Sequence, residues 1–252
     1  MNSKPGPIVL LGSGETSPSI RKVYESLFQR FEPPVNIAIL ETPAGFEPNS
    51  DYVAGQIGAY LEKHLQNHRP EISIIPVRKR GTEFSPDNPD LLTPMFDADL
   101  LLMGPGSPTY AARQLRDSVA WQTLQACQRL GMAIVFASAT TIASSRHALP
   151  VYEIYKVGED LHWQDGLDFF APFGLNLVFV PHWNNSDGGE VLDTSHCYVG
   201  TERYDQMISL LPEDAPDDNS VERTIVGIDE NTALVFEPAD GICSVQLSLI
   251  HI

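Results

Sequence analysis

Short runs of apolar residues recur along the chain and are separated by segments in which apolar residues return every three or four positions. The six clearest runs occupy residues 8–11, 37–40, 72–77, 100–103, 133–137 and 177–180. A run of four to six apolar residues bounded by polar or turn-forming residues predicts a buried strand. Strands that alternate with helical segments predict a parallel sheet whose strands are joined by crossover helices.

The segments between these runs predict the helices, and the last part of the chain adds further strands. Apolar residues have helical spacing in 18–31 and 51–64, and 108–130 is expected to form one long or broken helix that ends at Gly131. A further helix is expected at 204–211, followed by strands at 224–228, 233–236 and 243–247. The pattern predicts a single α/β domain over residues 1–252, a three-layer sandwich with a mainly parallel central sheet.

Composition places the chain among globular proteins. Its 252 residues are 42% hydrophobic, which is enough to bury a full core. The longest apolar runs are far shorter than a membrane span, and the N-terminus lacks the hydrophobic segment of a secretory signal. Cys127, Cys197 and Cys243 are odd in number and widely spaced, so we expect reduced thiols. These features predict a cytoplasmic protein without a membrane partner.

The charge of the chain excludes one large class of partners. A formal net charge of −17 would repel a phosphate backbone, and no basic stripe offsets it, so nucleic acid is not expected to bind. Part of the acid excess lies in 212–218, which predicts a solvated surface loop. The final residues 247–252 are apolar, as in a buried last strand or a truncated or foreign end. The sequence is compatible with a homodimer.

The residues that follow the predicted strands are the first candidates for function, because ligands of an open parallel sheet bind at the carboxyl ends of its strands. Ser138 follows the strand at 133–137, and His182 follows the strand at 177–180. Glycine-rich loops follow two other strands, and we expect all these segments to line one crevice. The remaining residues predicted to line it are Gly14, Glu15, Gly104, Ser107, Asn184 and Asn185.

Ser138 is the candidate nucleophile. It is flanked by Ala137 and Ala139 and leads from an apolar run into a helical segment, as in a nucleophile elbow. Such a turn lifts the serine above the sheet and places a helix N-terminus beneath it, which favours negative charge on a reacting oxygen. Phe136 and Thr140 replace the glycines that usually stand two residues to either side. We expect the β-branched Thr140 to widen the turn or to occupy space that a substrate main chain would otherwise take.

A serine hydroxyl needs a base to take its proton, and that base needs an acid to fix its tautomer. His182 is the candidate base. Glu153 is the candidate acid, because it lies among apolar neighbours and gives the Ser–acid–His order of several α/β hydrolases. The alternatives to this acid are Glu159, Asp160 and Asp165.

Two backbone N–H groups would complete this site. Gly106 lies in a loop whose glycines let a ligand oxygen approach the main chain closely. Ala139 directly follows the candidate nucleophile. Both N–H groups are predicted to donate to the negatively charged oxygen of a tetrahedral intermediate.

Other chemistries fit the sequence less well. Gly12 and Gly14 lack the third glycine of a dinucleotide fingerprint, so we expect neither NAD nor FAD and no other cofactor. A cluster of metal-type ligands matches no standard zinc or iron spacing, so a hydrogen-bonded loop without metal is expected. Its members are His182, Asp187, Asp193, His196 and Cys197. A cysteine nucleophile is disfavoured, because no cysteine follows a predicted strand at the right place.

With these residues assembled, the chain resembles the dipeptidase E and cyanophycinase family of serine peptidases, whose fold is like that of class I glutamine amidotransferases. The resemblance covers most of the chain and rests on residues 104–108, 138–139, 181–182 and 227–234. The last stretch, Gly-Ile-Asp-Glu-Asn-Thr-Ala-Leu, is the most specific. The resemblance implies a catalytic serine at Ser138, a catalytic histidine at His182 and an acid near Glu153.

Two functions from different classes follow from these observations. The first is a serine hydrolase or peptidase that cleaves small peptides or amides through Ser138, His182 and Glu153. The alternative is a catalytically inactive, amidotransferase-like binding or scaffold protein that kept the crevice and lost the geometry of the elbow. One distance separates them, because the hydrolase requires Ser138 within hydrogen-bond reach of His182.

Overall fold

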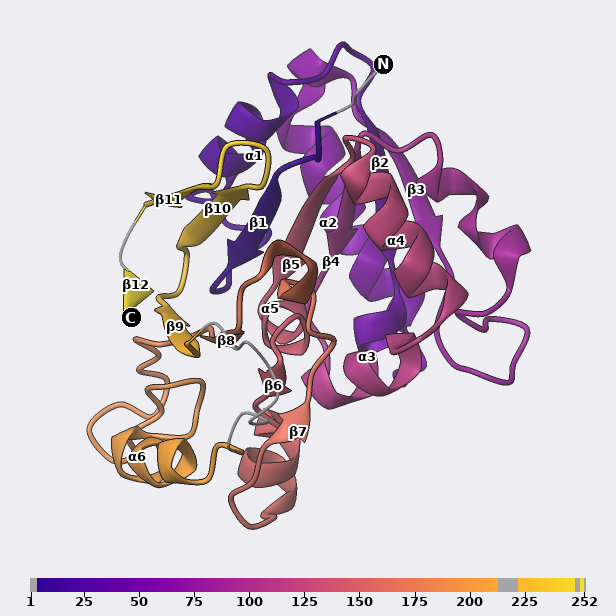
Figure 1. Ribbon diagram of the computed structural model, residues 1–252. Helices are drawn as coiled ribbons and strands as arrows, with labels where there is room; N and C mark the ends of the chain where they lie inside the picture. The colour runs from indigo at the N-terminus through magenta and orange to yellow at the C-terminus, as the bar shows by residue number, and fades with distance from the viewer. Residues whose placement is uncertain (1–3, 213–221, 248–249, 252) are drawn as a thin grey trace.

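The computed structural model describes residues 4–212, 222–247 and 250–251, and a seven-stranded sheet forms its centre (Figure 1). In spatial order the strands are β11 (Ile242–Gln246), β10 (Ala233–Glu237), β1 (Ile8–Leu11), β5 (Ala133–Ala137), β4 (Leu100–Met103), β2 (Asn36–Leu40) and β3 (Glu71–Ile75). Five neighbouring strands run parallel to one another, namely β1, β5, β4, β2 and β3, and β10 and β11 add an antiparallel edge beside β1. The predicted strands at 8–11, 100–103 and 133–137 are confirmed to the residue.

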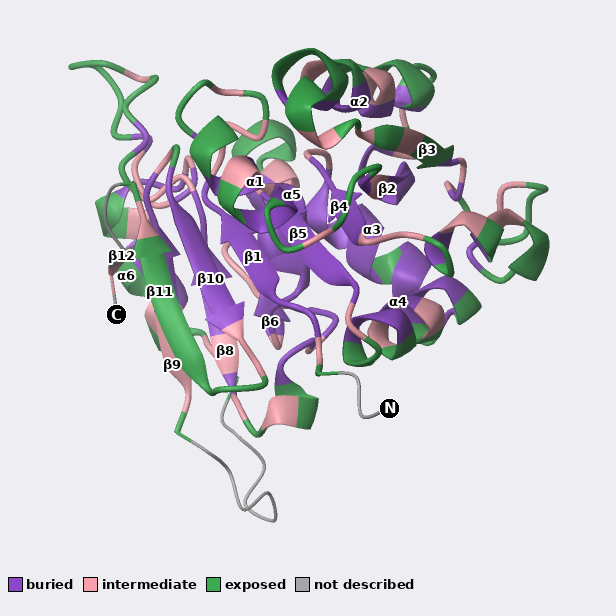
Figure 2. Ribbon diagram, turned by 90° about the horizontal axis from the view of Figure 1, so that it is seen from above, coloured by how far each residue is buried: buried purple, intermediate pink, exposed green. Residues whose placement is uncertain are grey.

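Helices cover both faces of the central sheet and produce three layers (Figure 2). The helices α1 (Arg21–Phe28) and α2 (Ser50–His64) pack on one face, and α3 (Pro108–Leu115) and α4 (Val119–Arg129) pack on the other. Successive residues of a strand point to opposite faces, so the strands between these layers bury both sets of side chains. This double burial explains why the strands read as continuous apolar runs and confirms the predicted three-layer α/β fold.

The predicted helices are present with altered ends. The segment predicted as one long or broken helix at 108–130 is broken at Asp117, which has φ 57°. Ser118 then caps α4 by accepting a hydrogen bond from Trp121 N–H. The helix predicted at 204–211 is α6 (Thr201–Ser209).

A smaller sheet lies beside the central one and contains β8 (Leu177–Val180), which was predicted from the sixth apolar run. β8 pairs in parallel with β9 (Thr224–Ile228), and β12 (Ile250–His251) pairs with the other side of β9. Val180 lies opposite Gly227, so the segments that follow β8 and β9 leave the sheet side by side. The other short elements are α5 (Ala139–Ala143), β6 (His147–Ala148), β7 (Gln164–Asp165) and the π-helical turn η4 (Glu153–Val157).

Surface features add little to the fold. All three cysteines are free, and residues 213–218 of the predicted acidic loop lie outside the described part of the chain. Within that part, no helix is both long and apolar enough to cross a membrane.

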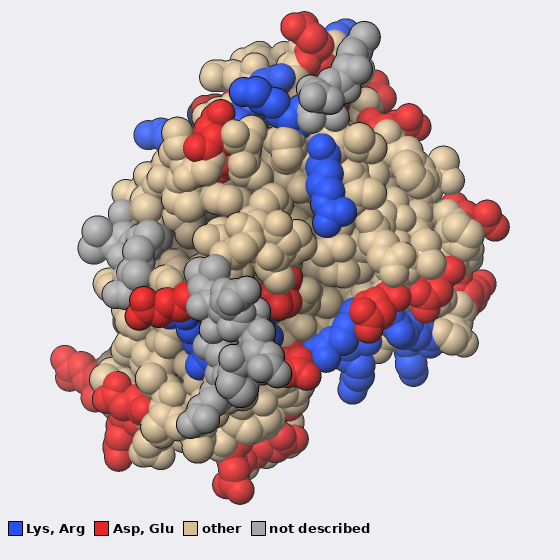
Figure 3. Space-filling model, in the orientation of Figure 1, with Lys and Arg blue, Asp and Glu red and all other residues tan. Residues whose placement is uncertain are grey.

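On the face drawn in Figure 3, Lys and Arg side chains near α3 lie beside acidic side chains. Arg116, at the end of α3, forms an ion pair with Asp165.

Gly227 gives a test of how tightly the smaller sheet packs. A Cβ atom at this position would overlap the indole ring of Trp183, the residue that follows His182. We expect Gly227→Ala to lower the free energy of unfolding by about 1–3 kcal/mol, because the ring must shift. Gly55→Ala is the control: it lies within α2 with no atom near the added methyl group, and should stabilise by up to about 1 kcal/mol. Equal stability of the two variants in urea denaturation would contradict this packing.

Candidate active site

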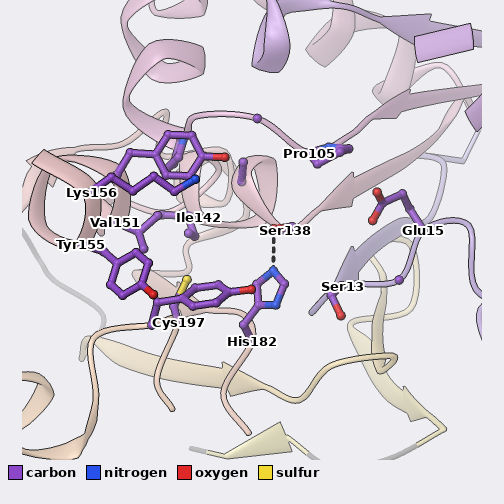
Figure 4. Close-up of a pocket in the computed structure, with 16 residues that line it drawn as sticks. Ser13, Glu15, Pro105, Ser138, Ile142, Val151, Tyr155, Lys156, His182 and Cys197 are labelled. Carbon is purple, nitrogen blue, oxygen red and sulfur yellow. Dashed lines mark hydrogen bonds between the residues drawn. The ribbon is translucent and has the colours of Figure 1, made fainter. Parts of the chain in front are cut away.

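Ser138 lies at a sharp turn between β5 and α5, where its φ is 52° and its ψ is −103°. Residues with a side chain rarely adopt this conformation, which costs about 1–3 kcal/mol. The turn directs the Ser138 side chain into the crevice at the carboxyl ends of the central strands. Its Oγ lies 2.8 Å from His182 Nε2 (Figure 4). The strand–turn–helix geometry expected around Ser138 is therefore present.

Two threonine hydroxyls tie this turn to the neighbouring strands. Thr140 Oγ1 donates a hydrogen bond to the carbonyl oxygen of Met103 at 2.6 Å and accepts one from the N–H of Ala137 at 2.9 Å. Thr141 Oγ1 lies 2.9 Å from the carbonyl oxygen of Leu11. The turn is thus connected to the ends of β4 and β1, and these bonds offset the cost of its strained backbone.

The expectation that Thr140 widens the turn or occupies substrate space is wrong. Its side chain is buried and hydrogen-bonded to the end of β4, and it does not line the cavity beside Ser138. The side chain points into the protein interior, where its hydroxyl bonds the main chain of Met103 and Ala137. Thr140 therefore stabilises the turn, and the glycine usual at this position of a nucleophile elbow is not needed to form it.

His182 connects the serine to a carboxylate that was not predicted. Its Nδ1 lies 2.7 Å from Oε1 of Glu230. An ionised carboxylate can only accept, so Nδ1 carries the proton and donates it to Glu230. Nε2 is then left as the acceptor for the hydroxyl of Ser138. The three side chains form one continuous row of hydrogen bonds with a defined direction.

Glu230 lies in the turn between β9 and β10 and is held by two neighbouring amides. Asn185 Nδ2 donates to Glu230 Oε1 at 2.9 Å, and the N–H of Glu230 donates to Asn184 Oδ1 at 2.8 Å. The hydrogen bond from His182 lowers the pKa of Glu230 below its ordinary value, and that from Asn185 acts in the same direction against the opposing effect of burial. Asn184 and Asn185 were predicted to line the crevice, and the structure instead places them around the acid.

The assignment of Glu153 as the partner of His182 is incorrect. Glu153 Oε1 accepts a hydrogen bond from Thr109 Oγ1 at 2.5 Å, on the side of η4 that faces α3. Apolar neighbours in sequence indicated that Glu153 is partly buried, but they did not identify its partner. The alternative acids are also placed elsewhere. Glu159 lies near His162, Asp165 pairs with Arg116, and Asp160 is exposed next to Glu159.

Sequence reasoning missed Glu230 although its segment, 227–234, carried the most specific part of the family resemblance. That segment was read only as two strands and a turn. The missing information was the pairing of β8 with β9, which brings the residue two positions after β9 beside the residue two positions after β8. A search for acids in the turn following each predicted strand would have included Glu230.

A cavity of about 480 Å³ opens beside Ser138, within the range of small-molecule sites. Ile142, Val151 and Tyr155 lie to one side of the serine, and Ser13 and Glu15 lie to the other (Figure 4). The rest of the lining consists of Gly14, Pro105, Gly106, Pro108, Ala139, Tyr152, Lys156, His182, Cys197 and Tyr198. Gly14 and Glu15 were predicted here, whereas Gly104, Ser107, Asn184 and Asn185 lie outside this lining.

Gly106 and Ala139 both line the cavity that contains Ser138. Gly106 has φ 150°, and a Cβ atom there would overlap the carbonyl group of Pro43, so the position requires glycine. Ala139 is the first residue of α5, and its N–H has no acceptor within its own helix. The positions of both residues are compatible with the predicted role as hydrogen-bond donors to a reacting oxygen.

The residues considered as metal-type ligands belong to a hydrogen-bonded loop after β8. Asp193 accepts hydrogen bonds from Ser195 and from the N–H of Thr201, and these bonds lower its pKa. Burial raises the pKa of the Cys197 thiol to about 12, so this thiol stays protonated at neutral pH. Among the described residues, no three His, Cys, Asp or Glu side chains are grouped as metal ligands.

The hydroxyl of Thr140 provides a direct test of how the turn is held. Thr140→Val keeps the volume and removes the hydrogen bonds to Met103 and Ala137, so we expect a loss of about 1–3 kcal/mol in the free energy of unfolding. Thr140→Gly should destabilise at least as much and should not broaden substrate choice, because the side chain does not line the cavity. The exposed Thr93→Val serves as a control, with an expected change within about 0.5 kcal/mol. If Thr140→Val has the same free energy of unfolding in urea as wild type, the hydroxyl does not hold the turn.

The lowered pKa of Glu230 predicts part of the acid sensitivity of the fold. A carboxylate whose folded-state pKa is depressed contributes stability above its unfolded pKa, and this contribution disappears as the pH falls through the folded value. Between about pH 6 and pH 3, wild type should therefore lose more free energy of unfolding than Glu230→Gln. Glu62→Gln, an exposed carboxylate on α2, should follow wild type. Parallel curves for wild type and Glu230→Gln would show that the hydrogen bond to His182 does not favour the ionised form.

No protein-family model matches the chain, and no curated protein matches it in sequence. Several solved structures share its fold, including the following two. One is a peptidase from an acI-B1 Actinobacterium, with a TM-score of 0.70 and 23% identity, covering 100% of this chain and 92% of that one. The other is described as a "Putative Peptidase E Protein" from Listeria monocytogenes EGD-e, with a TM-score of 0.61 and 14% identity, covering 97% of this chain and 100% of that one. The chain therefore has the peptidase E-like α/β fold of these two proteins.

Proposed function

We propose that the protein is a serine hydrolase that cleaves small peptide or amide substrates. The observation that carries this proposal is the row of hydrogen bonds from Ser138 through His182 to Glu230. An imidazole that contacts a serine hydroxyl through one ring nitrogen and a carboxylate through the other is the arrangement that activates a serine. The likeness in fold to two peptidases supports peptides or amides as the substrate class.

In this proposal, Ser138 Oγ attacks the carbonyl carbon of the substrate while His182 Nε2 takes the hydroxyl proton. The N–H groups of Gly106 and Ala139 donate to the carbonyl oxygen as it becomes negative. Glu230 stabilises the positive charge on His182, which then donates its proton to the leaving nitrogen as the C–N bond breaks. A water molecule, deprotonated by His182, hydrolyses the acyl group on Ser138, and the serine recovers its proton.

The experiment is labelling with a fluorophosphonate probe, which reacts with activated serines and needs no knowledge of the natural substrate. Wild type should be labelled, and Ser138→Ala should not. Glu230→Gln should react on the order of 10³-fold more slowly or worse, because the amide no longer fixes the useful tautomer of His182. The exposed Ser209→Ala on α6 is a matched control that should react like wild type.

The same experiment addresses the alternative, a catalytically inactive binding or scaffold protein. If folded wild type resists the probe, or if Ser138→Ala is labelled equally, the hydrolase proposal fails. Circular dichroism and thermal unfolding of each variant establish that it is folded.

A further inference from the structure

Glu153, which does not contact His182, ends a chain of side-chain hydrogen bonds that begins beside Gly106. Glu153 Oε1 accepts a hydrogen bond from Thr109 Oγ1 at 2.5 Å, and Thr109 Oγ1 lies 2.9 Å from Ser107 Oγ. The N–H of Ser107 also donates to the carbonyl oxygen of Pro43 at 2.9 Å. The residue that follows Gly106 is thus fixed from two sides.

The hydrogen bond from Thr109 to Glu153 sets the direction of this chain. The hydroxyl of Thr109 donates its one proton to Glu153 Oε1, so it must itself accept from the hydroxyl of Ser107. Ser107 Oγ in turn accepts from the N–H of Tyr110 at the start of α3. The hydroxyls of Ser107 and Thr109 each donate one hydrogen bond and accept another. These bonds leave the loop before α3 little freedom to rotate.

Glu153 also connects two segments that line the cavity. It is the first residue of η4, and the same turn supplies Tyr155 and Lys156 to the lining. Gly106 lines the cavity from the loop before α3. A single contact between Glu153 and Thr109 therefore joins the turn that faces the substrate to the loop that carries a proposed oxyanion donor.

The second oxygen of Glu153 indicates that stability alone does not explain this residue. Glu153 Oε2 is buried and has no hydrogen-bond partner among the described residues. Burying a carboxylate oxygen without a partner is unfavourable, so the position of this oxygen calls for an explanation other than stability. Turns with π-helical hydrogen bonding, such as η4, are likewise frequent at functional sites.

We propose that Glu153 is a positioning residue that holds the Gly106 N–H in place through Thr109 and Ser107. The inference rests on the proposed function, because it assigns Gly106 to the stabilisation of a negatively charged oxygen. A donor that acts only on that oxygen affects the transition state and leaves ground-state binding almost unchanged. Loss of the Glu153–Thr109 contact should therefore lower kcat and leave KM nearly constant.

The test compares Thr109→Val and Glu153→Met, which approximately keep side-chain size, in the hydrolysis of p-nitrophenyl acetate. We expect kcat to fall about 10-fold or more in each variant with KM within about threefold, since complete loss of one oxyanion donor costs about 10²–10³-fold. Inhibition by phenylboronic acid, which forms a tetrahedral adduct with an activated serine, should weaken in parallel with kcat. Thr109→Ser and Glu153→Gln keep a hydroxyl and an acceptor oxygen, so they should recover most of the loss.

Glu159→Gln removes the same charge from the neighbouring exposed position and should behave like wild type. If kcat of Thr109→Val and Glu153→Met stays within threefold of wild type while wild type reacts with the fluorophosphonate probe, the positioning role fails and the proposed function stands. If KM rises as much as kcat falls, the contact shapes ground-state binding and the inference is also wrong.

If Thr109→Val or Glu153→Met does not fold, the test rests on Thr109→Ser and Glu153→Gln. A fall in kcat of more than 10-fold in both of these variants would contradict the positioning role. If folded wild type reacts neither with the fluorophosphonate probe nor with p-nitrophenyl acetate, both proposals fail together.

Discussion

The strained backbone of Ser138 is the constraint on which the candidate site depends. Its φ of 52° and ψ of −103° are unfavourable for a residue with a Cβ atom, and the conformation persists only because its surroundings impose it. The N–H of Ser138 donates to Leu11 O, and Thr140 and Thr141 bond to the ends of β4 and β1. The strands β1, β5 and β4 are aligned by their parallel register, with Leu11 of β1 opposite Ala137 of β5. The central sheet therefore acts as the rigid support that fixes the direction of one side chain.

The other two members of the row come from the smaller sheet, so the site forms where two sheets meet. His182 and Glu230 each lie two residues beyond strands that pair in parallel, and this pairing brings them together although they are far apart in sequence. The N–H of His182 donates to the carbonyl oxygen of Gly12, directly after β1. Small shifts between the sheets would change the distance between Ser138 and His182, so the packing of the two sheets controls the geometry of the candidate site.

The sequence predicted the features that depend on local pattern and not those that depend on which elements pair. Apolar runs located the central strands, and the residue types after them located Ser138 and His182. Glu153 was chosen for its apolar neighbours and its place between those residues, but proximity in sequence does not determine which carboxylate reaches an imidazole. Glu230 was missed because only the pairing of β8 with β9 brings it to His182. Thr140 was judged by its bulk, whereas in the structure its hydroxyl bonds the carbonyl oxygen of Met103, a contact that the sequence alone does not reveal.

We infer that Glu230 keeps the proton of His182 on Nδ1 and leaves Nε2 free to accept the proton of Ser138. Nitrogen-15 NMR of histidine-labelled protein at neutral pH distinguishes the two tautomers directly and requires no substrate. We expect His182 in wild type to be protonated on Nδ1, with Nε2 as an acceptor, and Glu230→Gln to lose this preference. A proton on Nε2 in wild type, or an unchanged tautomer in Glu230→Gln, would contradict it.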